Sequence, residues 1–267
     1  MKMKKKSNLV VVFHDLNTGL NSFKIWWMLA WQDIKKRYRR STLGPFWITL
    51  STIIMVGLMG PIYSLLFNIN FQDYLSYLAI SFIIWNFISL TINESCHAFI
   101  ESEEFIKQLN LPLSIYLIKI IVRNILIFLH NFTIILFIWV FFSFPGIESI
   151  IIFLFCFLLL IFNLFNLGLI LAILCTRYRD IPLIVNNLIF ACFFLTPILW
   201  KKEMLGERAF FADYNPIFIV IESVRSPLMG ESPTFNIISL NLIFSIVFFL
   251  LSILIFTKYR SRISYWI

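Results

Sequence analysis

Long apolar runs separated by short polar segments make up most of this 267-residue chain. A helix needs about 20 apolar residues to cross a hydrocarbon core roughly 30 Å thick. Six runs approach or exceed that length, and they predict transmembrane helices over 45–67, 74–93, 124–144, 150–175, 183–200 and 235–257. We therefore expect an all-α integral membrane protein with six transmembrane helices.

A shorter helix is predicted before the first span, within residues 21–43. Its apolar positions recur at spacings of four, four, three and four, so they share one helical face, with basic residues on or beside the other. This face carries Phe23, Trp27, Trp31, Ile34 and Tyr38. Such a helix is typical of an amphipathic helix lying in the membrane interface. We expect residues 1–20 to form a basic, poorly ordered tail.

Positive charge is concentrated at the end of this helix. Five cations occupy six positions there, followed by Ser41 and Thr42 as helix caps and by Pro45 in the first turn of the first span. These cations are Lys35, Lys36, Arg37, Arg39 and Arg40. The third apolar run carries Lys119 and Arg123 at its start, and we expect that end to project into the cytoplasm because a cation inside a bilayer is costly.

Composition agrees with this pattern, since 60% of the residues are hydrophobic and 13% are charged, against about 25% charged in soluble domains. The net charge of +8 would suggest nucleic acid in a soluble protein. With the amino end inside, however, 18 of the 22 Lys and Arg lie on the inner side of six spans. The charge therefore indicates that both termini are cytoplasmic, and we expect no nucleic-acid binding.

The inner segment 94–112 predicts an amphipathic helix. Phe99, Phe105, Ile106 and Leu109 can share one face, while the charged positions fall mostly elsewhere. These charged positions are Glu101, Glu103, Glu104 and Lys107. The segment is either a solvated surface helix or the docking element for a partner.

An outer segment lies between the fifth and sixth spans. Its apolar run, 214–221, is too short to cross a bilayer, and we expect a re-entrant or interfacial helical hairpin. Glu222 and Arg225 are three residues apart and can pair on one helical face. A structural salt bridge is the simplest interpretation of that pair.

The sequence contains no catalytic constellation. His14, His97 and His130 are scattered, no GxxxxGK loop is present, and the four cysteines lack CxxC spacing, so we expect reduced packing cysteines and no metal. Asp and Glu are nearly absent from the predicted spans, which argues against a membrane-embedded enzyme. Asparagines in the spans either bond helix to helix, which we favour, or line a polar route. They are Asn131, Asn163, Asn166, Asn186 and Asn187, with His130 beside them.

Several motifs carry a family resemblance when taken in order. They are DIKKRYRRSTLGPFW, PIYSLLF, WNFISLTINES, FIKQLNLP, RYRDIP, FFLTPILW and YNPIFIVIESVRSPLMGE. From about residue 30 to 265 the chain resembles the membrane subunit of an ATP-binding-cassette polysaccharide exporter. The permeases of lipopolysaccharide O-antigen export are the nearest in pattern, and capsule and teichoic-acid exporters are related.

This resemblance implies a non-enzymatic transport permease in the bacterial inner membrane. The implied assembly is a homodimer with two copies of a cytoplasmic ATPase, which binds ATP and Mg, so no cofactor is expected on this chain. The implied substrate is a polysaccharide linked to undecaprenyl diphosphate. The cation cluster at 35–40 is our candidate for the diphosphate. Residues 44–267 correspond to the transmembrane domain, with a coupling helix within 94–112 and periplasmic gate helices within 204–233.

The resemblance also suggests roles for individual residues. Channel-lining candidates are Tyr63, Trp85, Phe87, Phe193 and Phe194. Coupling candidates are Phe99, Glu101, Glu103, Glu104, Phe105 and Lys107. Gate candidates are Tyr214, Asn215, Pro216, Glu222 and Arg225. The alternatives are a capsule or teichoic-acid exporter, a small-molecule exporter of the same superfamily, or a membrane-embedded polyprenyl-linked transferase.

Overall fold

The computed structural model describes residues 8–37, 39, 41–44, 46–141 and 144–267, and their regular structure is helical. Pro45 and Arg40 lie outside the described residues. The helices are α1 Asn8–Asn21, α2 Phe23–Arg37, α3 Phe46–Phe67, α4 Phe71–His97, α5 Glu103–Gln108, α6 Ser114–Phe141, α7 Ile147–Arg177, α8 Ile181–Leu195, η1 Lys202–Arg208, α9 Phe210–Asp213, α10 Pro216–Leu228, α11 Phe235–Tyr259, η2 Arg260–Arg262 and α12 Ile263–Trp266.

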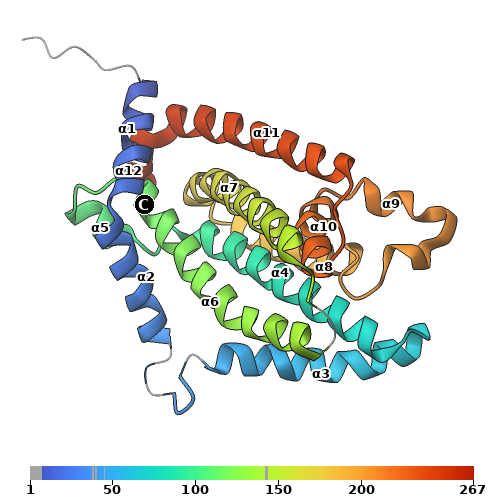
Figure 1. Cartoon of the computed structure of the whole chain (residues 1–267). Helices are drawn as coiled ribbons and strands as arrows, with labels where there is room; N and C mark the ends of the chain where they lie inside the picture. The colour runs from blue at the N-terminus through green and yellow to red at the C-terminus, as the bar shows by residue number, and fades with distance from the viewer. Residues whose placement is uncertain (1–7, 38, 40, 45, 142–143) are drawn as a thin grey trace, which may run out of the picture.

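Five helices in the described part of the chain are long and apolar enough to cross a membrane. These are α3, α4, α6, α7 and α11, and they run lengthwise through the bundle (Figure 1). Helices α1, α2, α5 and α12 lie at one end, which we call the termini end. The opposite end, formed by η1 and α9, is the hairpin end.

The prediction of a fifth span over 183–200 is wrong in its extent. Helix α8 has 15 residues, about 22 Å at 1.5 Å per residue, which is shorter than a hydrocarbon core of about 30 Å. The helix ends at Leu195 because Thr196 precedes Pro197, and a residue before proline is driven into extended backbone. Residues 196–200 continue without regular structure.

The irregular segment 196–200 is nevertheless stabilised by buried hydrogen bonds. The Tyr74 hydroxyl donates to the Leu199 carbonyl at 2.6 Å. The Tyr77 hydroxyl lies 2.9 Å from the carbonyls of both Pro197 and Trp200. Non-helical backbone at membrane depth requires such partners because no water is available there.

The expected disorder of the 1–20 tail is wrong for residues 8–20, which lie in α1, and residues 1–7 lie outside the described residues. The Asp15 side chain is fully buried and accepts from the backbone N–H groups of Leu113 and Ser114 at 3.1 and 3.0 Å. It also pairs with Arg260 at 2.6 Å. One carboxylate therefore caps the start of α6 and joins the two terminal segments of the chain.

Asparagines in the long helices bond helix to helix, as we favoured. Asn163 donates to Asn241 at 2.8 Å, linking α7 to α11, and Asn166 accepts from Ser252 at 2.6 Å. Asn131 accepts from Thr52 at 3.1 Å, linking α6 to α3. By contrast, Asn186 and Asn187 are exposed on α8, and the Nδ1 atom of His130 lies 2.9 Å from the Leu126 carbonyl of its own helix.

Helix α4 is the most enclosed of the five long helices. In its apolar window 61% of the residues are buried, against 22–39% for the others. Phe87 lies between Phe128 and Phe157, with ring centroids 5.5 and 5.4 Å away. Because other helices cover most of α4, the one face that they leave uncovered is available to contact a ligand or another chain.

Candidate functional site

Helix α10 clamps the end of α8 at the hairpin end. Arg225 donates to the Pro197 carbonyl at 2.7 Å and to Ser81 at 2.9 Å, and its guanidinium lies 4.3 Å from the Tyr77 ring centroid. It also pairs with Glu222, as the spacing predicted. Arg225 is buried, so these contacts replace its hydration shell.

The other predicted gate residues lie at the start of α10. Asn215 caps this helix, accepting from the Ile217 N–H at 2.9 Å, and Pro216 occupies the first turn. The Asn215 amide also donates to Thr196 at 3.0 Å, so both ends of α10 are bonded to the break after α8. Tyr214 is exposed. Residues 216–228 of the predicted hairpin therefore form helix α10, which packs into the bundle against α4, α7 and α11.

A second group of charges is buried at the termini end. Arg123 on α6 pairs with Asp33 on α2 at 2.9 Å and with Glu94 on α4 at 2.5 Å. Lys119 lies 3.5 Å from Asp33. The sequence alone did not indicate these partners, because α2 and α4 cover Lys119 and Arg123 and supply carboxylates from distant segments, while the cytoplasmic position of this end stays a prediction.

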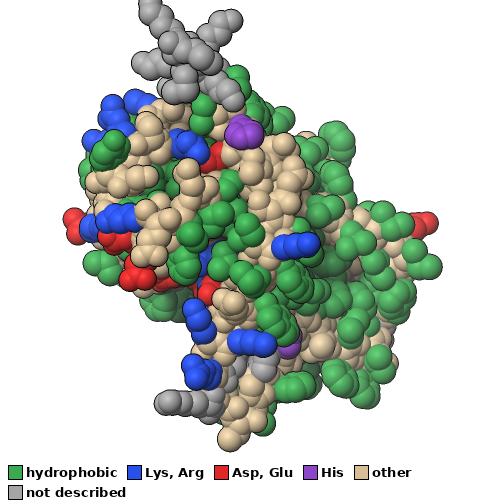
Figure 2. Space-filling view, turned by 90° about the vertical axis from the view of Figure 1, so that its left-hand side faces the viewer, with side chains coloured by type: hydrophobic (Ala, Val, Ile, Leu, Met, Phe, Trp, Pro, Cys, Tyr) green, Lys and Arg blue, Asp and Glu red, His purple; other side chains and the backbone are tan. Residues whose placement is uncertain are grey.

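The predicted cation cluster is divided by this network. Arg37 pairs with Glu94 at 2.7 Å and so joins this network, although its own side chain is 39% exposed. Lys35, Lys36 and Arg39 are exposed. In a view onto the termini end, Lys and Arg side chains gather on the surface, with Asp and Glu beside some of them (Figure 2).

The predicted coupling segment combines an anchor and an exposed helix. Phe99 is completely buried in the core, so it fixes the segment to the bundle. In contrast, Phe105 and Leu109 are 46% and 48% exposed. Lys107 bonds Glu103 at 2.5 Å and lowers the pKa of that carboxyl by favouring its charged form. Glu101 and Glu104 are exposed.

Three of the five channel-lining candidates come together between α4 and α8. Phe193 lies 5.7 Å from Trp85 and 5.3 Å from Phe194, measured between ring centroids. Tyr63 lies on α3 against Phe67. Phe87 is covered by other helices of the same chain. Their role in a channel stays a prediction.

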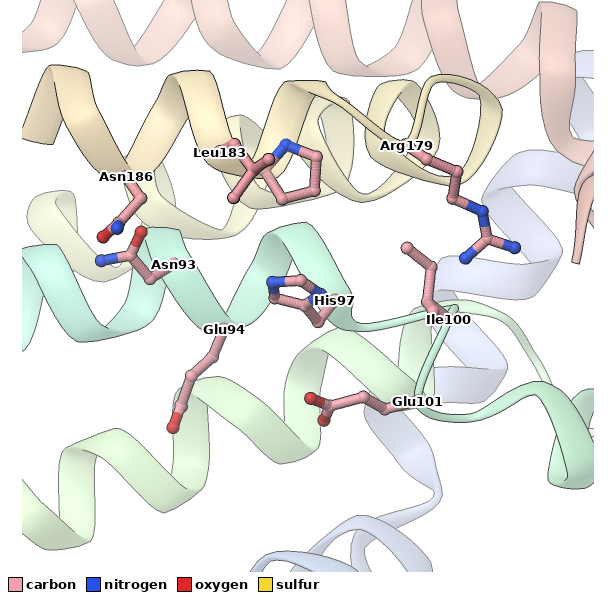
Figure 3. A pocket seen from close by; sticks show the side chains of 9 residues that line it. Asn93, Glu94, His97, Ile100, Glu101, Arg179, Leu183 and Asn186 are labelled. Carbon is pink, nitrogen blue, oxygen red and sulfur yellow. The ribbon is translucent and has the colours of Figure 1, made fainter.

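An open cavity of about 630 Å³ lies at the termini end, between α4 and the α7–α8 turn. Asn93 from α4 and Asn186 from α8 face each other across it, and His97 lies one turn further along α4 (Figure 3). Arg179 and Glu101 complete its polar lining. Asn93 was not among the residues predicted for a site, although it lies four residues before His97 in the sequence.

These observations describe a multi-pass membrane protein with polar sites at both ends of an apolar bundle. Residues 25–229 match the family model described as ABC-2 type transporter, and the chain belongs to that family. Two O-antigen export system permease proteins RfbA from Klebsiella pneumoniae are each 25% identical over 99% of both chains. The protein of the same name from Myxococcus xanthus is 22% identical over 74% of this chain and 77% of its own.

Replacing Arg225 with alanine is expected to destabilise the purified protein by about 3 kcal/mol, because Glu222 and the Pro197 carbonyl lose a buried partner. The midpoint of thermal unfolding in detergent measures the change. Arg208→Ala is the matched control, since Arg208 is exposed at the same end. Equal midpoints for the two variants would contradict a structural role for Arg225.

Proposed function

We propose that this chain is the transmembrane subunit of an ABC transporter that exports polysaccharide linked to undecaprenyl diphosphate across the bacterial inner membrane. The observation that carries the proposal is the match to the ABC-2 family together with nearly full-length similarity to O-antigen export permeases. The chain acts as a permease, and a separate ATPase binds ATP and Mg.

Six crossings with both termini in the cytoplasm agree with the geometry. Helix α7 ends at the termini end and η1 lies at the hairpin end (Figure 1). Residues 178–201 therefore carry the chain back through the bundle as α8 and the segment 196–200. The hydrogen bonds from Tyr74, Tyr77 and Arg225 make this irregular crossing acceptable at membrane depth. The termini end then faces the cytoplasm, in agreement with the distribution of Lys and Arg.

A homodimer agrees with the exposure of α3 and α8. Helix α8 is apolar yet has no buried residue, and only 22% of the apolar window of α3 is buried. Asn186 and Asn187 are exposed on α8, where lipid would be an unfavourable neighbour. A second copy of the chain would cover both helices, leaving the substrate path along the seam between the copies.

The exposed part of the coupling segment is our candidate for ATPase docking. Phe105 and Leu109 present apolar surface beyond the end of the bundle, while Phe99 holds the segment to the core. Glu101, Glu103, Glu104 and Lys107 surround this surface with charge. An apolar centre with a polar rim is the usual anatomy of a protein–protein interface.

The exposed cations Lys35, Lys36 and Arg39 are our candidates for contacting the lipid diphosphate. An anionic headgroup arriving in the inner leaflet meets them at the end of the interfacial helix α2. Arg37 pairs with Glu94 on α4, and we assign it a structural role. Arg40 remains a candidate from the sequence.

Deleting the gene is expected to leave lipid-linked polymer on the cytoplasmic face of the inner membrane and to remove it from the cell surface. Surface polymer is measured by blotting, and polymer inside spheroplasts by its resistance to an added glycosidase. Restoring the gene on a plasmid is the control. Unchanged surface polymer in the deletion strain would refute the proposed function.

The triple change Lys35→Gln, Lys36→Gln and Arg39→Gln is expected to lower export about tenfold or more, since each cation contributes roughly 1 kcal/mol of attraction to an anionic lipid surface. The measurement is surface polymer per copy of inserted chain. The control is Lys258→Gln with Arg262→Gln, which removes exposed cations at the same end. Equal export in the two variants would contradict a role in substrate binding for Lys35, Lys36 and Arg39. These cations would then only set the orientation of the chain in the membrane.

The double change Phe105→Ser and Leu109→Ser is expected to reduce the amount of co-purifying ATPase about tenfold, because apolar anchors dominate such interfaces. Phe13→Ser is the control, since Phe13 is a similarly exposed aromatic residue at the termini end. Full recovery of the ATPase with the double variant would show that docking occurs elsewhere.

A further inference from the structure

The uncovered face of α4 carries a row of polar side chains. Asn86, Ser89, Asn93 and His97 follow one another at spacings of three, four and four, so they share one face of the helix. The first three are half-buried and His97 is exposed, while Trp85, the neighbour of Asn86, belongs to the core. We call these four residues the polar ladder.

Two cavities flank the polar ladder and share one of its residues. The cavity of about 630 Å³ is lined by Asn93 and His97, with Asn186 opposite (Figure 3). A second cavity, of about 300 Å³, is lined by Asn86, Ser89 and Asn93 together with residues of α3 and α6 and with Arg37 of α2, which pairs with Glu94. Asn93 lines both, so the polar surface extends from the termini end well into α4.

A row of asparagines on a membrane-spanning helix requires polar neighbours. Polar side chains in such helices face other helices or water-filled cavities, because lipid offers no hydrogen bonds. Asn163 and Asn166 meet this requirement within the bundle. The side-chain amides of Asn86 and Asn93 make no hydrogen bond to other described residues. Both amides therefore have unused donors and acceptors that face a cavity.

We propose that the polar ladder binds the hydroxyl groups of the sugar residues being transported. A primary amide both donates and accepts hydrogen bonds, as does a sugar hydroxyl, so each can satisfy the other. Ser89 supplies a further hydroxyl, and His97 a ring with a donor and an acceptor. The larger cavity falls in the size range of small-molecule sites, roughly 300–1,000 Å³.

Carboxylates beside the ladder favour sugar over phosphate as the ligand. Glu101 lines the larger cavity together with Arg179. Glu94 also borders it but points from α4 toward α6, where Arg123 pairs with it (Figure 3). The Glu101 carboxylate offsets the attraction that Arg179 would exert on a phosphate, whereas sugar hydroxyls can both donate to Glu101 and accept from Arg179. The headgroup contacts thus remain with the exposed cations at 35–39.

Aromatic rings continue the same face of α4 toward the hairpin end. Phe82 lies four residues before Asn86, and its ring centroid is 6.3 Å from that of Phe193. Phe193 rests on the buried Trp85, at 5.7 Å between ring centroids, so the partly exposed rings of this surface are those of Phe82 and Phe193. Polar groups for hydroxyls are thus followed by flat apolar surfaces for the faces of sugar rings. This order suits a polymer that passes along α4.

The test compares apolar and polar replacements of the ladder amides and rests on the proposed export function. The double variant Asn86→Leu/Asn93→Leu is expected to lower surface polymer about tenfold at equal membrane abundance and ATPase co-purification, because two hydrogen-bonding groups are lost. Asn86→Ser/Asn93→Ser keeps a donor and an acceptor at each position and is expected to export within about twofold of the native chain. If the Leu pair fails to accumulate, the Ala pair replaces it.

Asn236→Ala is the control, since Asn236 is exposed at the start of α11, away from both cavities. Normal export by the apolar variant would overturn the ladder assignment. The proposed function is judged separately, by whether the gene deletion abolishes export.

Photo-crosslinking distinguishes sugar from headgroup. A photoreactive amino acid at position 93 is expected to capture glycan in cells that make the full polymer. In cells blocked in chain elongation, which make only undecaprenyl diphosphate bearing a single sugar, capture is expected to fall about tenfold or more, because fewer sugars reach the ladder. Equal capture in the two strains would assign this surface to the headgroup and overturn the proposal.

Discussion

The structure depends on pairing every charge that enters its apolar bundle. An unpaired ion in such surroundings costs several kcal/mol. The carboxylate of Asp15 meets Arg260, that of Glu94 meets Arg123, and that of Glu222 meets Arg225. Two of these contacts join helices distant in sequence, and Arg225 reaches distant segments through its bonds to Ser81 and Pro197. The charges therefore specify how the helices pack, which uniform apolar surfaces cannot do alone.

Helix α4 connects these polar sites. Ser81, near its middle, is bonded by Arg225 from α10, and Glu94, near its end, belongs to the network with α2 and α6. Asn86, Ser89 and Asn93 of the polar ladder lie between them, and His97 lies one turn beyond Asn93. The proposed transport of a hydrophilic polymer requires polar contacts inside a membrane that are not exposed to lipid. The enclosed position of α4 meets both requirements.

Hydropathy predicted the long helices well because length and composition alone determine whether a helix can cross a bilayer. It failed at α8, where Pro197 ends the helix and side chains from α4 and α10 stabilise the break. It also gave no sign that Asp15 would order α1, since its partners Leu113 and Arg260 are distant in sequence. The pair Glu222–Arg225 was predictable because its spacing is local.

In the candidate site, too, contacts between segments distant in sequence could not be predicted from the sequence. Sequence reasoning treated the cations at 35–40 as one group, whereas the fold gives Arg37 a partner on α4 and leaves its neighbours exposed. The family resemblance suggested aromatic rings as channel walls, which stays a prediction, and the polar ladder was not recognised although its spacing was present in the sequence. Only the structure shows that the ladder faces cavities while Phe87, on the same helix, faces the core.

Helix α4 is continuous between the two ends and contacts segments at both of them. Phe99 lies two residues beyond its last turn and is completely buried, so displacement of the coupling segment must move either this core contact or α4 itself. At the other end, Tyr74 and Tyr77 of α4 hold the segment that replaces the end of α8. Packed and hydrogen-bonded residues of α4 therefore connect the segment that carries α5 to the irregular segment 196–200, which Arg225 of α10 also contacts. Rigid elements of this kind transmit small displacements between distant sites.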